Sequence, residues 1–170
     1  MLLDLINLSK LRRAIVYALL FLVLFVLQDL LVSHITVLGV HALLIPAAVI
    51  AVGLFDGGAW GGFIGLAAGY FCDLGYSDQT VLFTVLFPAI GFFCGVLGKY
   101  FLRKGFVSYL VLTLAALTLI TFSQMIRFLF LTETDAASVY RIGLIQVLYS
   151  LAWAVPVYFP CRIIANRPLN

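Results

Sequence analysis

The sequence predicts an all-α integral membrane protein, a bundle of six transmembrane helices forming one polytopic domain over residues 1–170. Two observations support this class. Hydrophobic residues make up 65% of the chain and charged residues only 10%, with a mean hydropathy of +1.20. Soluble domains carry about 25% charged residues. The polar residues also fall in short groups between long apolar runs, which is the pattern of a helical membrane protein.

A glycine-spaced stretch organises the chain. Glycine recurs at every fourth position and Asp73 continues the series. Residues four apart lie nearly on one line of a helix. Each glycine would cost a water-exposed helix about 1 kcal/mol against alanine, whereas in a bilayer small residues let another helix approach closely. We therefore predict a helix over 57–74 whose face packs against another helix or binds a partner, formed by Gly57, Gly61, Gly62, Gly65 and Gly69.

Before this stretch we expect an amphipathic N-terminal segment on the membrane surface, followed by two membrane spans. Residues 1–13 alternate apolar and polar residues and end on three basic residues, so they are predicted to lie on the membrane surface. The apolar run over 14–32 is long for a signal peptide and precedes further spans, which favours an uncleaved first helix. The second span covers 37–55, and we expect Pro46 to bend it.

Three more spans are predicted after the glycine helix. A polar turn leads into the fourth span over 80–98, which contains Pro88. A basic connector precedes the fifth and longest span, 106–131. An acidic turn then leads to the last span, 139–160, with Pro156 inside it. We expect both prolines to bend their helices, because membrane bundles supply groups that satisfy the freed backbone.

The distribution of basic residues predicts how the protein is oriented in the membrane. Cytoplasmic loops carry an excess of Lys and Arg, so the side that gathers them is the cytoplasmic side, and both termini are predicted to lie there. This distribution, in small groups between apolar runs, gives no indication of nucleic-acid binding. Five acidic residues fall on the other side: Asp29, Asp73, Asp78, Glu133 and Asp135. Eight of the ten basic residues share the first side: Lys10, Arg12, Arg13, Lys99, Arg103, Lys104, Arg162 and Arg167.

The sequence predicts no enzyme, cofactor or metal site. It contains neither a P-loop nor a G-x-S-x-G motif. Asp56 and Asp73 flank the glycine helix about 25 Å apart at 1.5 Å per residue, too far to share a proton. His34 and His41 have no ligand cluster beside them. The cysteines lack metal-ligand spacing and are predicted to be buried: Cys72, Cys94 and Cys161.

A polar cluster is predicted toward the outer ends of the spans, formed by Asp29, Asp73, Gln124 and Arg127. Ionisable groups inside a membrane usually face the bundle and pair. We expect Arg127 to pair with Asp73, with Asp29 as the rival carboxylate. The alternative is that Arg127 extends to the outer headgroups.

These motifs resemble those of the rod shape-determining protein MreD family. The resemblance rests on Pro46, on Gly62-Phe63-Ile64-Gly65-Leu66, on Gly69-x-x-x-Asp73-Leu74, and on the length, span number and basic connector. The turn Gly75–Thr80 departs from the family pattern. The family is distantly similar in fold to the substrate-binding membrane subunits of energy-coupling-factor transporters. The resemblance implies a non-enzymatic scaffold in the bacterial cell membrane that binds MreC. Through MreC it would be connected to the MreB filament and to the RodA–penicillin-binding-protein synthase. Its implied role is to help control cell shape and peptidoglycan synthesis.

A second hypothesis is a membrane substrate-binding subunit for a vitamin-like or lipid-linked small molecule. Such a carrier needs a polar and aromatic pocket that opens outward. The sequence offers residues for one: Tyr70, Tyr76, Gln79, Gln124 and Tyr140. The outer loops are only a few residues long and supply little lid, so the scaffold is the preferred interpretation.

Overall fold

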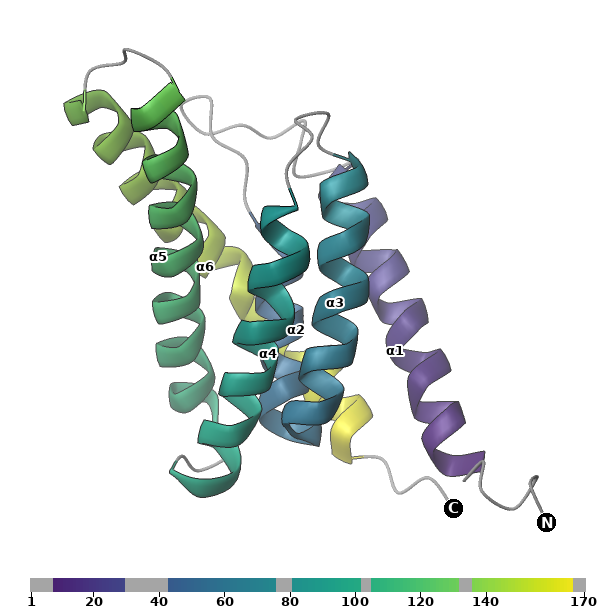
Figure 1. Ribbon diagram of the computed structural model, residues 1–170. Coiled ribbons are helices and arrows are strands. Elements are labelled where there is room, and N and C mark those ends of the chain that lie inside the picture. Colours follow the sequence, from purple (N-terminus) through teal and green to yellow (C-terminus); the bar gives the residue numbers. More distant parts are fainter. Residues whose placement is uncertain (1–7, 30–42, 76–80, 102–104, 132–135, 167–170) are drawn as a thin grey trace.

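The computed structural model describes residues 8–29, 43–75, 81–101, 105–131 and 136–166, and these residues form helices and contain no strand. The prediction of an all-helical protein is confirmed for this part of the chain. Helices α1 and α5 lie on opposite flanks of the bundle, and α6 starts beside α5 and runs obliquely behind α4 (Figure 1). Their bounds are α1 Leu8–Leu27, α2 Ile45–Asp56, α3 Gly58–Gly75, α4 Leu82–Tyr100, α5 Phe106–Leu131 and α6 Ala136–Asn166.

Three of the described helices are long and apolar enough to cross a membrane. They are α4 over its full length, α5 over Phe106–Ile126 and α6 over Val139–Asn166. A hydrocarbon core of about 30 Å needs about 20 apolar residues in a helix. The apolar part of α1, Ala14–Leu27, and helix α2 are shorter than this. The three long helices are those expected of a membrane protein.

Helix α2 differs from its predicted span. The sequence predicted one helix over 37–55, but the described helix begins only at Ile45. Pro46 lies in its first turn and does not bend it. Proline is accommodated there because the first N–H groups of a helix have no partner within the helix. With 12 residues at 1.5 Å each, α2 is about 18 Å long and shorter than the hydrocarbon core.

Two other boundaries also differ from the prediction. Helix α1 begins at Leu8, so the last residues of the N-terminal segment 1–13, which was expected to lie on the membrane surface, already belong to this helix. Helix α6 begins before residue 139 and continues through Pro156 and Pro160 to Asn166. The end of an apolar run does not fix the end of a helix, because polar residues can continue the helix beyond the run.

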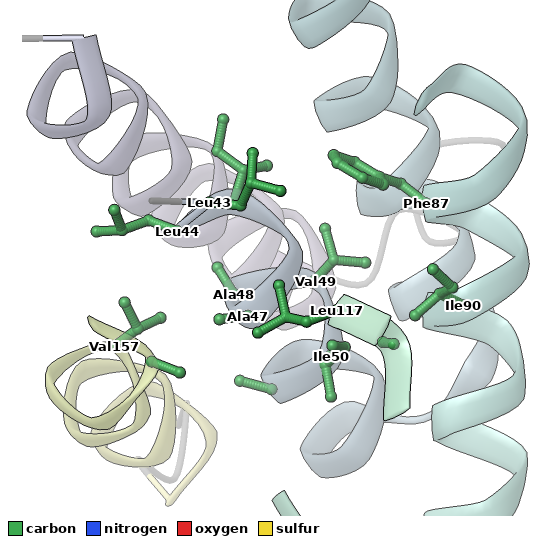
Figure 2. Close-up of a cluster of buried hydrophobic side chains, with 14 of the residues drawn as sticks. Leu43, Leu44, Ala47, Ala48, Val49, Ile50, Phe87, Ile90, Leu117 and Val157 are labelled. Carbon is green, nitrogen blue, oxygen red and sulfur yellow. The ribbon is translucent and has the colours of Figure 1, made fainter. Parts of the chain in front are cut away.

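Helix α2 is the centre of the bundle. It contacts each of the other five helices, and every residue from Ile45 to Phe55 is buried. Helix α2 carries apolar residues on all of its sides, which is the pattern of a fully buried helix. Figure 2 shows its side chains facing Phe87 of α4, Leu117 of α5 and Val157 of α6.

Side chains from two neighbouring helices satisfy the buried start of α2. The side-chain oxygen Oε1 of Gln28 accepts hydrogen bonds from the N–H groups of Leu44 and Ile45, at 3.0 and 3.2 Å. The hydroxyl of Ser150 in α6 accepts one from the N–H of Leu43 at 3.0 Å. A buried N–H without a partner costs about 1–3 kcal/mol. These bonds therefore allow a helix to begin inside an apolar bundle.

Helix α1 is attached to both ends of α2. Gln28 follows its last turn and bonds the start of α2, as described above. Nearer its own start, the hydroxyl of Tyr17 donates to the carboxylate of Asp56, the last residue of α2. Tyr17, Leu24 and Gln28 form its buried side. Large apolar side chains cover the rest and are exposed: Ile15, Leu19, Leu22, Val23, Phe25 and Val26.

We predict that replacing Gln28 with leucine lowers the free energy of unfolding by about 1–3 kcal/mol, because two buried N–H groups lose their acceptor. Titration with a denaturing detergent, followed by tryptophan fluorescence, measures this change. Asp29→Leu is the matched control, since the neighbouring side chain is exposed. Equal losses in the two variants would contradict the role of Gln28.

Candidate functional site

The glycine face of α3 packs directly on the backbone of α4. A Cβ atom added to Gly65 would lie 2.6 Å from the carbonyl oxygen of Phe87. One added to Gly69 would collide with the carbonyl of Phe83. Such contacts leave no room for a methyl group unless a helix moves. These two glycines therefore serve the internal contact between α3 and α4.

Three helices meet at one glycine crossing, formed by Gly53 of α2, Gly61 of α3 and Gly91 of α4. A Cβ atom on Gly61 would lie 2.5 Å from the carbonyl oxygen of Gly91 and 2.6 Å from the Cα atom of Gly53. One turn further along α4, Gly95 approaches the backbone of Gly58 just as closely. The crossing fixes α2, α3 and α4 as a unit, because each helix packs against the backbone of the other two.

Two of the predicted face glycines have other surroundings. Gly57 precedes α3 and ends α2, with a φ of +102° that favours glycine. No atom lies within 4 Å of the place where its Cβ would be. At Gly62 the nearest atoms would be 3.7 Å away, an ordinary contact. For Gly57 the regular four-residue spacing concealed this difference, because the spacing continues through the turn that separates α2 from α3.

The opposite side of α3 carries large exposed side chains, at positions that lie on one half of the helix surface. We call this set the outer stripe: Phe63, Leu66, Tyr70, Phe71 and Leu74. Because α4 covers the glycine side, the outer stripe is the side of α3 that remains free for a lipid or a partner helix.

Asp73, near the end of α3, caps the start of α4. Its carboxylate accepts hydrogen bonds from the N–H of Phe83 at 3.1 Å and from the N–H and hydroxyl of Thr84 at 2.7 and 2.6 Å. The first N–H groups of a helix lack partners within it, and an anion near them is favourable. Asp73 thus closes the antiparallel pair formed by α3 and α4 (Figure 1).

The structure does not bring the predicted polar cluster together among its described side chains. Both carboxylate oxygens of Asp73 bond α4, Asp29 is exposed and Gln124 is half-buried. These three side chains make no hydrogen bond with one another. The side chain of Arg127 lies outside the described residues, so its pairing with Asp73 stays a prediction.

The residues predicted to line a carrier pocket also lie apart from one another where they are described. Tyr70 belongs to the outer stripe, and Tyr140 is exposed near the start of α6. Tyr76 and Gln79 lie outside the described residues. No pocket is therefore assembled from the described members of this set.

An aromatic cluster around Tyr158 was not predicted from the sequence. The ring of Tyr158 in α6 lies 5.7 Å from that of Phe55 in α2, 5.1 Å from that of Phe106 and 5.2 Å from that of Tyr109, both in α5. The hydroxyl of Tyr109 donates to the carbonyl of Ala154 at 3.0 Å. The cluster joins the α5–α6 pair to α2. The signal available in the sequence was an aromatic residue near one end of each of three spans.

Two buried hydroxyl groups in the described part of the chain have no hydrogen-bond partner. They belong to Thr121 in α5 and to Tyr158. A buried polar group without a partner is unusual and calls for an explanation. Water or a small ligand with polar atoms can supply the missing bonds.

The described residues contain no group of three or more His, Cys, Asp or Glu side chains that could hold a metal ion. His34 and His41 lie outside them. The three cysteines are free and buried, at Cys72, Cys94 and Cys161.

Comparisons with known proteins give no match. No protein-family model matches the chain, and neither does any curated protein or solved structure. The resemblance to the MreD family therefore rests on the sequence features described above.

We predict that Gly61→Ala lowers the free energy of unfolding by about 1–3 kcal/mol, the usual cost of overpacking, because its methyl group meets the backbones of two helices. Gly62→Ala is the matched control on the same turn. It should leave stability unchanged or raise it by up to about 1 kcal/mol. Heating with a thiol-reactive dye measures the release of the buried cysteines. Equal losses in both variants would disprove the glycine crossing.

We predict that Asp73→Ala lowers the free energy of unfolding by about 0.5–2 kcal/mol, the usual cost of losing a helix cap. Asp73→Asn should retain only part of the stability, because its amide has one acceptor oxygen where both carboxylate oxygens of Asp73 accept hydrogen bonds from α4. The same dye assay compares the two variants. If neither variant lowers the stability, the hydrogen bonds from Asp73 to the start of α4 contribute nothing measurable and the capping role is wrong.

Proposed function

We propose that this chain is a non-enzymatic membrane scaffold of the bacterial cell-elongation machinery. In this proposal it binds an MreC-like membrane protein and, through that partner, the MreB filament and the RodA–penicillin-binding-protein synthase. It thereby helps to control cell shape and peptidoglycan synthesis. The resemblance of its glycine helix to that of the MreD family supports the assignment, as does a rigid unit of three helices held at the crossing of Gly53, Gly61 and Gly91.

The proposal includes six spans in the bacterial cytoplasmic membrane with both termini in the cytoplasm. Its support is the grouping of basic residues on one side of the six-span arrangement. Figure 1 agrees for the described part, because the start of α1 and the ends of α4 and α6 lie at one end of the bundle. Lys99 and Arg162 are on the last turns of α4 and α6.

The outer stripe of α3 is the observation that carries the proposed partner site. The glycine side of the same helix is covered by α4 and so is closed to a partner. The outer stripe presents large apolar and aromatic side chains at the spacing of one helix face. A transmembrane helix of the partner would pack between such side chains, gaining dispersion contacts that fluid lipid chains provide less well.

We predict that replacing Phe63 and Phe71 together by alanine lowers the amount of co-purified MreC-like protein at least about tenfold, as expected for the loss of two aromatic anchors. Phe93→Ala with Phe122→Ala is the matched control, because these phenylalanines are comparably exposed on α4 and α5. The variants are compared after capture from native membranes, with partners and lipids identified together. Unchanged capture with the α3 variant, or equal loss in the control, would reject this face as the partner site.

A membrane substrate-binding subunit is the second candidate function. The hydroxyls of Thr121 and Tyr158, buried without partners among the described residues, each offer one polar contact for a ligand, but at separate places, because Tyr158 packs on Tyr109, at the other end of α5 from Thr121. A vitamin-like or lipid-linked small molecule could bond such groups. The same purification distinguishes the two candidates, because a carrier should retain a small molecule in about equal amount to the protein even when no protein partner is captured.

A further inference from the structure

One end of the bundle carries exposed cations on three different helices. We call this set the basic rim: Arg12 in the first turns of α1, Lys99 in the last turn of α4 and Arg162 in the last turns of α6. Figure 1 shows the corresponding helix ends at the same end of the molecule. The carboxylate described at this end, Asp56, accepts a hydrogen bond from Tyr17. At the opposite end the described charges are mixed, with Asp29, Asp73 and Arg141.

The packed core fixes the positions of Lys99 and Arg162. Gly98, the neighbour of Lys99, packs against Leu54 in the last turns of α2. The guanidinium of Arg162 lies 5.7 Å from the centre of the Tyr158 ring, which in turn packs on Phe55 of α2. The two cations therefore both lie near the end of α2 that carries Leu54 and Phe55.

Exposed aromatic rings beside these cations indicate the depth of the rim in the membrane. Tyr100 and Phe101 are 69% and 80% exposed, and the ammonium group of Lys99 lies 5.3 Å from the centre of the Tyr100 ring. Phe159, next to Tyr158, is also exposed. Aromatic rings are favoured at the interface between hydrocarbon and headgroups. Lys99 and Arg162 therefore have the aromatic neighbours expected of cations that reach lipid phosphates.

We propose that the basic rim binds the phosphate headgroups of anionic phospholipids in preference to zwitterionic ones. A zwitterionic headgroup carries its own cation beside the phosphate, whereas an anionic headgroup leaves a net negative charge for Lys99 or Arg162. Each basic residue at an anionic membrane surface contributes about 1 kcal/mol. This inference rests on the membrane setting of the chain and is independent of the proposed protein partner.

Trp60 is a natural reporter for lipids near Lys99. It lies two residues after Gly58, which packs against Gly95 and Val96 of α4, one turn before Lys99. In the Trp153→Phe variant it is the single tryptophan. The protein is reconstituted into vesicles of phosphatidylglycerol and phosphatidylcholine in equal parts, with bromine on the acyl chains of one lipid at a time. Quenching of Trp60 then gives the ratio of the two lipids beside the rim.

We expect phosphatidylglycerol to be enriched beside Trp60, and Lys99→Gln to lower that enrichment by up to about fivefold, the factor that one cation contributes. Lys99→Arg should keep the enrichment because it keeps the charge. Arg141→Gln, which removes one exposed cation at the opposite end, is the matched control and should also keep it. Salt at about 1 M should lower the enrichment in the protein with Lys99 intact, since it screens exposed charges.

Equal amounts of both lipids beside Trp60 would overturn the proposal without any further variant. So would an enrichment that Lys99→Gln leaves unchanged or that Arg141→Gln lowers equally. Inorganic phosphate at millimolar concentration tests the headgroup alone. If it abolishes the enrichment at an ionic strength where chloride does not, free phosphate displaces the lipid and is the ligand that the rim prefers, which overturns the lipid assignment. Loss of partner capture has no bearing on these measurements, so the two proposals fail separately.

Discussion

The close approach of three helix backbones at Gly53, Gly61 and Gly91 is the constraint on which the rest of the structure depends. At this crossing there is no space for a side chain, so a larger residue at any of the three positions would force α2, α3 and α4 apart. Helix α2 is thereby held in the centre, where it contacts all the other helices. The α5–α6 pair and α1 then pack against a unit whose geometry is already fixed. Small residues allow this in a membrane, where the hydrophobic effect does not drive helices together.

Three of the polar side chains described inside the bundle satisfy the N–H groups at helix starts. Asp73 bonds the first turn of α4, Gln28 and Ser150 bond the start of α2, and Asp56 bonds Tyr17. Ionisable residues in membrane helices are by default candidates for functional sites. Here a structural role explains these side chains without a functional site, because backbone N–H groups in an apolar interior need acceptors. Thr121 and Tyr158 stand apart, since their hydroxyls are buried without partners in the described part of the chain.

This division of roles leaves the outer surfaces available for binding. The glycine side of α3 is closed by α4, whereas the outer stripe faces away from the bundle. The basic rim lies at the end where α4 and α6 finish, beside exposed aromatic rings. A scaffold of this kind would present a rigid apolar face to a partner helix and cationic side chains to the membrane surface. Neither surface requires a catalytic group.

The sequence by itself determined the all-helical class and much of the helix placement, because hydropathy and glycine spacing are local properties. The bounds of α5 agree with the predicted 106–131, and helix α3 begins one residue after its predicted start. The start of α2 could not be predicted, because it depends on acceptors from Gln28 and Ser150, which are far away in the sequence. Only the tertiary structure decided that Asp73 bonds α4 and that Gly57 belongs to a turn. Residue spacing specifies which side chains share a helix face, whereas the partner of that face depends on how separate helices pack in space.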